Sequence, residues 1–73
     1  LGAIGSKMRV TVNGEVREAP DSATLAELLA SLGIESARVA VERNLEIAPK
    51  SLWPAIALAD GDRLEIVQFV GGG

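Results

Sequence analysis

The sequence contains no cysteine, no histidine and no tyrosine. Without cysteine, the chain can form neither a disulfide nor a thiolate metal site. Without histidine as well, it lacks the bases, nucleophiles and metal ligands that most active sites use. Its carboxylates are spread along the chain among arginines and lysines, as on a solvated surface. We therefore expect neither an enzyme with its own catalytic residues nor a bound cofactor or metal.

Charge and hydropathy argue against two further classes of partner. The formal net charge is −3, which disfavours a surface that binds nucleic acid or an anionic membrane. No apolar run approaches the roughly 20 residues that span a bilayer. Residues 1–7, LGAIGSK, are too short for a secretory signal and have no basic region before their apolar residues. We interpret them as an expression-tag remnant, take Met8 as the natural start, and expect a cytoplasmic protein with no nucleic-acid or membrane partner.

A chain of 73 residues has room for one domain, here residues 8–73. A domain of this size buries only about 60% of its unfolded surface, so its core must be rich in apolar residues. The composition agrees, because 48% of the residues are hydrophobic.

The first part of the domain reads as a β-hairpin. Residues 8–12 alternate between apolar and polar, as in a half-buried strand. Asn13-Gly14 is typical of a type I′ turn, which needs positive φ at both central residues. Residues 15–19 are a weaker second strand whose two apolar residues fall on opposite faces, so we expect a bulge or an early end. Pro20 then ends the pairing, since it lacks a backbone N–H.

A helix follows the hairpin. Thr24 and Glu27 have the spacing of a capping box, in which each side chain accepts a hydrogen bond from the other residue's backbone N–H. The apolar stripe that would face the core consists of Leu25, Leu28, Leu29 and Leu32. Gly33 suits the left-handed position just after the helix.

The second half of the chain predicts two more strands. Residues 38–42 form a strand with its valines inward, and residues 44–49 a connection. Residues 51–53 form a single helical turn with Trp53 in the core. After a tight turn at 60–62, the last strand covers residues 63–70 and carries Leu64 and Ile66 on one face.

These elements together predict an α+β fold. A single amphipathic helix must cover one face of a mixed four-stranded sheet. The first and last strands are then parallel neighbours in the centre of the sheet, as in a β-grasp.

Several stretches of the chain carry a family resemblance. They are VNGE at Val12–Glu15, TLAELLASLG at Thr24–Gly33, VAVERN at Val39–Asn44, PKSLW at Pro49–Trp53 and DGDRLEIVQFVGGG at Asp60–Gly73. Through them, residues 8–73 resemble the ThiS family, ubiquitin-like β-grasp sulfur carriers of thiamine (thiazole) biosynthesis. The extra glycine Gly71, before the usual terminal pair, is the one departure.

The resemblance implies a chemistry at the carboxylate of Gly73. A ThiF-like adenylyltransferase would adenylate this carboxylate with ATP, so that ATP is used by the partner and not bound as a cofactor. Sulfur from a cysteine desulfurase route would displace AMP and leave a thiocarboxylate, which the thiazole synthase ThiG would accept. The flexible tail, Gly71 to Gly73, suits delivery into narrow active sites because glycine has no side chain. Extended from Val70, the stalk reaches roughly 13 Å at about 3.3 Å per residue.

Alternation along the last strand also predicts a docking patch. Val67 and Phe69 fall on the face opposite to the buried one, close to the base of the tail. A solvent-facing aromatic beside a functional tail suggests an anchor for a partner protein. Val70 and Ala40, the latter outward on the neighbouring third strand, would extend the patch.

Three other functions share parts of this pattern. The small subunit of molybdopterin synthase uses the same kind of terminus, although the VNGE opening and the PKSLW loop look more like the thiamine carrier. A protein-conjugating modifier would form isopeptide bonds through the same glycine. A plain β-grasp binding module would keep its function without Gly72 and Gly73.

Overall fold

The computed structural model describes residues 7–69. Residues 1–6 of the predicted remnant 1–7 lie outside this range, as do the predicted tail and docking residues Val70, Gly71, Gly72 and Gly73. The elements are β1 (Lys7–Val12), β2 (Glu15–Pro20), α1 (Leu25–Ser31), the 3₁₀ helix η1 (Ser36–Arg38), β3 (Val39–Arg43), β4 (Glu46–Ile47), the 3₁₀ helix η2 (Lys50–Ala55) and β5 (Arg63–Gln68).

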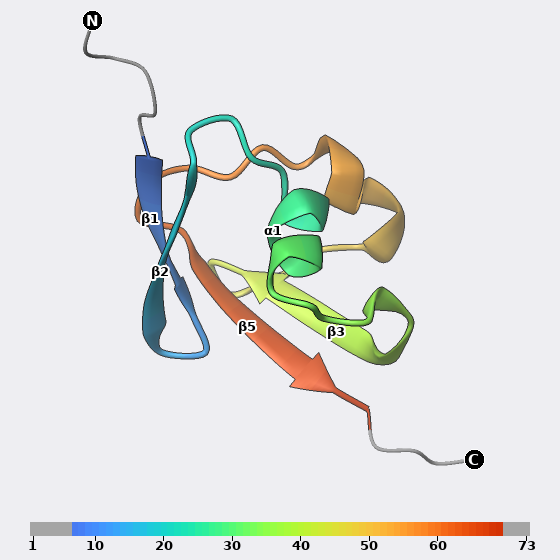
Figure 1. Cartoon of the computed structure of the whole chain (residues 1–73). Coiled ribbons are helices and arrows are strands. Elements are labelled where there is room, and N and C mark those ends of the chain that lie inside the picture. The colour runs from blue at the N-terminus through green and yellow to red at the C-terminus, as the bar shows by residue number, and fades with distance from the viewer. Residues whose placement is uncertain (1–6, 70–73) are drawn as a thin grey trace, which may run out of the picture.

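The strands form one mixed sheet in the order β2-β1-β5-β3-β4, and α1 lies across one face of it (Figure 1). β1 and β5 are parallel, while the other three neighbouring pairs are antiparallel. The predicted α+β fold with parallel first and last strands at its centre is confirmed. The sheet has five strands in the described chain, so the prediction of four is wrong by one.

The N-terminal hairpin forms around the predicted turn. Asn13 and Gly14 have φ of 49° and 85°, which matches the double positive φ of a type I′ turn. β1 begins at Lys7, one residue before the predicted start. The register runs without interruption from Lys7↔Pro20 to the turn, so the expected bulge or early end of β2 is wrong. The reason is that β2 is an edge strand, where Val16 can stay 63% exposed instead of sharing a buried face with a second apolar residue.

Helix α1 forms as its local signals predict. The capping box joins Thr24 and Glu27 through both hydrogen bonds, at 2.9 and 3.2 Å. The first three leucines of the stripe are buried, and Leu32 is the half-buried C-cap. Gly33 follows with φ of 74°, which allows the chain to leave the helix in a left-handed conformation.

The segment between β3 and β5 departs from the prediction. β3 starts at Val39, because Arg38 belongs to η1. A turn with positive φ at Asn44 and Leu45 leads into β4, which lies inside the stretch expected to be only a connection. β4 escaped prediction because it has two residues, both exposed, and so shows no alternation of burial.

The predicted helical turn is a six-residue 3₁₀ helix, η2. It places Trp53 in the core at 3% exposure, as expected from the sequence. The indole Nε1–H donates to the carbonyl oxygen of Ala48 at 2.8 Å, which satisfies the buried ring nitrogen.

The core lies between α1, η2 and the inner face of the sheet. Its buried residues are Met8, Val10, Val12, Ala19, Ala23, Leu25, Leu28, Leu29, Val39, Val41, Ala48, Trp53, Leu58 and Leu64. No helix within residues 7–69 is both long enough and apolar enough to cross a membrane.

Candidate functional site

The strand that leads to the glycine tail, β5, occupies the middle of the sheet between β1 and β3 (Figure 1). Its inner face carries Leu64, which is 1% exposed, and the half-buried Ile66. The residues that hold this strand therefore determine where the tail begins.

Asn13, in the β1–β2 turn, holds one side of β5. Its side-chain Oδ1 accepts a hydrogen bond from the N–H of Ile66 at 2.7 Å, and its Nδ2 donates to the carbonyl of the same residue at 3.2 Å. Its backbone N–H donates to the carbonyl of Leu64 at 2.9 Å. The amide side chain thus takes the place of a strand residue where β1 has already ended.

Asn44, in the β3–β4 turn, holds the start of β5 from the other side. Its Oδ1 accepts from the N–H of Arg63 at 2.9 Å, and its own N–H donates to the carbonyl of Arg63 at 2.8 Å. Each of the two asparagines therefore bonds to both the N–H and the carbonyl of one β5 residue, Asn13 through its side chain alone and Asn44 through its side chain and its backbone N–H.

Asp62 joins this arrangement immediately before β5. It is 6% exposed and accepts three hydrogen bonds, from Arg43 Nε at 2.9 Å, Asn44 Nδ2 at 3.0 Å and the N–H of Ala59 at 2.9 Å. Burial alone would raise the pKa of this carboxyl, but the hydrogen bonds to Asn44, Ala59 and Arg43, with the charge of Arg43, outweigh it and lower the pKa. The carboxylate is ionised at neutral pH and ties two segments, one at Arg43 and Asn44 and one at Ala59, to the start of the strand.

The far end of β5 carries exposed apolar side chains. Val67 pairs with Ala40 of β3, and the N–H of Phe69 donates to the carbonyl of Arg38 at 2.8 Å. Val67 and Phe69 are 57% and 56% exposed, and Ala40 is exposed beside them. The predicted outward orientation of all three is confirmed. We call Ala40, Val67 and Phe69 the outer patch.

The predicted site is therefore only partly visible in the described chain. The outer patch is assembled by two neighbouring strands next to the start of the tail, while Val70 and the three glycines lie beyond residue 69. Within residues 7–69, no three or more metal-ligating side chains are gathered in one place. The geometry of the described residues is that of a strand held on both sides, with an apolar surface at its C-terminal end.

Comparison with known proteins agrees with this geometry. The model of the ThiS family matches residues 10–73, which include the whole tail. The chain belongs to the ThiS family. This family includes sulfur carrier proteins of thiamine biosynthesis.

Individual relatives show the same likeness. The chain is 46% identical over 63 residues to the sulfur carrier protein ThiS of Bacillus subtilis, a match that covers 85% of this chain and 96% of that protein. The crystal structure of the thiamine biosynthesis protein ThiS from Geobacter metallireducens superposes with a TM-score of 0.78 at 35% identity, and covers 90% of this chain and 100% of that one. These matches favour the thiamine carrier over the molybdopterin synthase subunit.

A second kind of relative is much longer. The thiazole synthase of Paramagnetospirillum magneticum is 54% identical over 66 residues, which cover 90% of this chain but only 20% of that protein. The chain thus spans about a fifth of the length of the thiazole synthases that it matches. In these relatives a ThiS-like segment and a thiazole synthase share one polypeptide.

No local pattern in the sequence identifies the residues that hold β5. Two of them, Asn13 and Asp62, lie in turns that the sequence predicts. The third, Asn44, lies at the start of the stretch expected to be a connection. The side chains of Asn13 and Asn44 bond to β5 residues 53 and 19 positions away along the chain, and the carboxylate of Asp62 bonds to Asn44, 18 positions away.

Proposed function

We propose that this chain carries sulfur for thiazole formation as a thiocarboxylate on Gly73. A carboxylate oxygen of Gly73 attacks the α-phosphate of ATP on a ThiF-like adenylyltransferase, so that pyrophosphate leaves and an acyl-adenylate forms. A sulfide equivalent from a cysteine desulfurase route attacks the acyl carbon and displaces AMP. The resulting thiocarboxylate donates its sulfur on the thiazole synthase ThiG. The partners supply the catalysis, and this chain supplies the reactive terminus.

The observation that carries the proposal is the family match, which includes β5, a strand held on both sides, and continues through Gly73. A carrier must present its terminus in a defined direction to more than one active site. The paired contacts of Asn13 and Asn44 with β5 supply that direction. Glycine then supplies a stalk that no side chain widens.

Intact mass spectrometry tests the chemistry directly. The chain is incubated with ATP, the adenylyltransferase and a sulfide source, and we expect a mass gain equal to the difference between sulfur and oxygen. A matched control carries one additional alanine after Gly73 and should gain nothing. Deletion of Gly72 and Gly73 should abolish thiazole formation, whereas a plain binding module would keep its activity. Attachment to lysines of other proteins, in place of sulfur transfer, would indicate a protein modifier.

The outer patch is the proposed docking surface for the adenylyltransferase. An exposed aromatic contributes strongly to binding when a partner buries it, and its truncation often costs 2 kcal/mol or more, about 30-fold in Kd. Phe69→Ala should therefore weaken binding about 30-fold, and Val67→Ala less.

Both variants should leave thermal stability nearly unchanged, since both side chains are more than half exposed. Val16→Ala is the matched control, because Val16 is 63% exposed on β2, two strands away from β5. A large fall in Tm with unchanged affinity for Phe69→Ala would show a role in folding instead of docking.

A further inference from the structure

β5 has one open backbone edge close to the tail. β1 pairs with it only at Thr11↔Arg63 and Val12↔Leu64, and the hairpin turn then leads β1 away. The side chain of Asn13 occupies the next position, at Ile66. On its other side β5 remains paired with β3 as far as Val39↔Gln68. The last part of β5 thus has a strand neighbour on one side only.

The backbone of Gln68 points to the open side. The N–H of Phe69 donates to Arg38 in the direction of β3, and the N–H and C=O of successive strand residues alternate in direction. Leu64 and Ile66, four and two residues earlier, both bond toward the β1 side. Gln68 therefore presents its N–H and C=O in that same direction. No backbone hydrogen bond joins them to another residue of the described chain.

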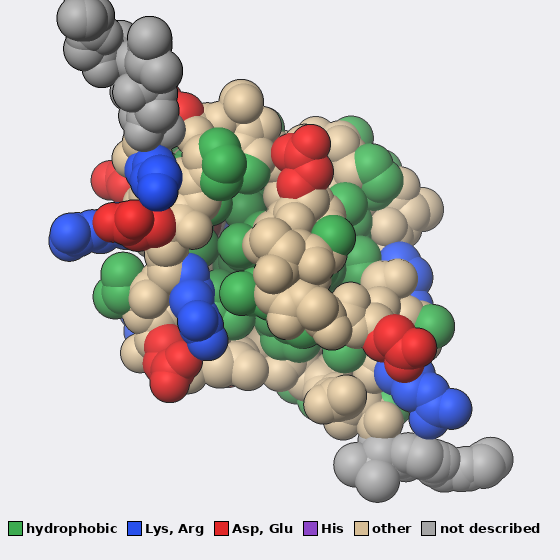
Figure 2. All heavy atoms as spheres, viewed as in Figure 1, with side chains coloured by type: hydrophobic (Ala, Val, Ile, Leu, Met, Phe, Trp, Pro, Cys, Tyr) green, Lys and Arg blue, Asp and Glu red, His purple; other side chains and the backbone are tan. Residues whose placement is uncertain are grey.

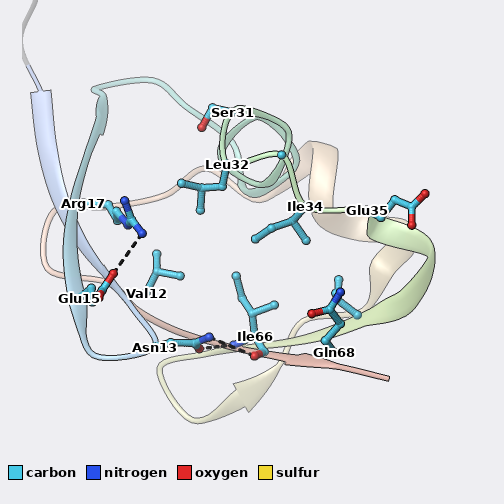
Figure 3. Close-up of a pocket in the computed structure, with 12 residues that line it drawn as sticks. Val12, Asn13, Glu15, Arg17, Ser31, Leu32, Ile34, Glu35, Ile66 and Gln68 are labelled. Carbon is cyan, nitrogen blue, oxygen red and sulfur yellow. Dashed lines mark hydrogen bonds and ion pairs between the residues drawn. The ribbon is translucent and has the colours of Figure 1, made fainter. Parts of the chain in front are cut away.

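A groove of about 790 Å³ lies beneath this edge on the inner side of the sheet. Its lining is mixed. The apolar side chains are Val12, Leu32, Ile34, Val39 and Ile66, and the charged ones are Glu15, Arg17 and Glu35. In Figure 3, Leu32 and Ile34 point from the end of the helix toward Val12 and Ile66 on the sheet.

The groove exists because α1 is short. The helix has seven residues and covers only part of the inner face. Figure 2 shows hydrophobic side chains exposed between the helix and the charged side chains of the β1–β2 hairpin, where Arg17 and Glu15 form an ion pair at 3.1 Å.

We propose that an extended segment of thiazole synthase adds as a strand to the open edge of β5, with an apolar side chain in the groove. This inference rests on the proposed function. An added strand exchanges backbone hydrogen bonds with the sheet and places alternate side chains on each face. Gln68 offers one donor and one acceptor for it, and the groove offers an apolar site on the inner face.

Two relatives favour thiazole synthase as the occupant. In each of them, one polypeptide joins a ThiS-like segment to thiazole synthase.

Hydrogen exchange of two adjacent amides tests the proposal in the unaltered chain. In the free chain the N–H of Gln68 should exchange quickly and that of Phe69 slowly, because only Phe69 donates to β3. Saturation with thiazole synthase should slow the exchange of Gln68 at least tenfold and leave the order of protection within β3 and β5 unchanged. Fast exchange of Gln68 in the saturated complex would overturn the proposal. The proposal would also be overturned if only the adenylyltransferase slowed the exchange of the Gln68 N–H. The same holds if dimerisation of the free chain slowed it.

A matched pair of substitutions tests the same contact by affinity. Gln68→Pro removes the N–H on the open side but none of the bonds to β3, and proline is tolerated at such edge positions. Gln68→Ala removes only the side chain. We expect Gln68→Pro to bind thiazole synthase about tenfold more weakly than Gln68→Ala, as for loss of one backbone hydrogen bond.

Equal affinities of the two variants, with Phe69 still protected from exchange, would refute strand addition. Failure of the unaltered chain to bind thiazole synthase or to gain sulfur would instead refute the proposed function. The two failures are therefore distinguishable in one set of measurements.

Discussion

Replacement of Asp62 by asparagine should destabilise the fold in a pH-dependent way. The carboxylate accepts three hydrogen bonds, while an amide keeps one acceptor oxygen and turns an NH₂ group toward a donor. Hydrogen bonds to charged groups contribute about 1.5–3 kcal/mol each, and Arg43 is partly exposed and can regain water. We therefore expect Asp62→Asn to lower the free energy of unfolding by about 2 kcal/mol at pH 7. For a domain of this size, that corresponds to a fall in Tm of about 8–16 °C.

The sign of the pH dependence follows from the lowered pKa of Asp62 in the folded chain. Ionised Asp62 stabilises the fold fully above the unfolded pKa of aspartate, about 3.9, and this contribution is lost as the pH falls through the folded pKa. The difference between the two proteins should be constant from about pH 5 to 8 and should shrink below about pH 4. Urea unfolding followed by the fluorescence of Trp53, the single tryptophan, measures it. Asp21→Asn, at an exposed turn position, is the control. A gap that persists undiminished at pH 2.5 would refute the reasoning.

Three further predictions concern stability and use the same unfolding assay, with Tm by circular dichroism for the tryptophan variant. Asn13→Gly keeps the positive φ but removes both side-chain bonds to Ile66, and should cost about 1–3 kcal/mol; an unchanged stability would show that the turn alone holds β5. Trp53→Phe leaves the carbonyl of Ala48 without its donor and should lower the free energy of unfolding by about 1–3 kcal/mol. A loss below about 0.5 kcal/mol would imply that water replaces the indole N–H as donor. Thr24→Ala removes the cap of α1 and should cost about 1 kcal/mol, which Thr24→Ser should largely restore.

The parts of the fold that could be predicted from the sequence depend on neighbours within a few residues. The Asn13-Gly14 turn, the capping box at Thr24 and the helix end at Gly33 are all local, and all are present. The outward orientation of Val67 and Phe69 follows from the period of a strand, and it is also confirmed.

The errors arise where burial does not mark the pairing. In the hairpin that contains β4, Leu45 is 89% exposed and Ile47 is 75% exposed, so the sequence reads as a connection. β2 keeps regular pairing although its two apolar residues do not share a face, since an edge strand needs little burial. Pairing through backbone bonds alone leaves no pattern in the side chains.

The contacts that position the candidate site could not be predicted because they are distant in sequence. Asn13 and Ile66 are 53 residues apart, and Asn44 and Asp62 are 18 apart. The open edge at Gln68 depends on where β1 stops relative to β5, which is a matter of register between strands. A single sequence indicates that these strands exist, but it does not show over how many residues each strand pairs with its neighbour.

The bonding of β5 also determines how the molecule responds when an enzyme pulls on its C-terminus. Traction on the tail acts along β5, while the hydrogen bonds that join β5 to β3 lie across the strand direction. The force is thus applied in shear and shared by several bonds at once, and the strand does not peel away one bond at a time. The paired contacts add resistance at two points, that of Asn44 at Arg63 at the start of the strand and that of Asn13 at Ile66 further along it. Separating β5 from β3 along the strand direction therefore requires several hydrogen bonds to break together.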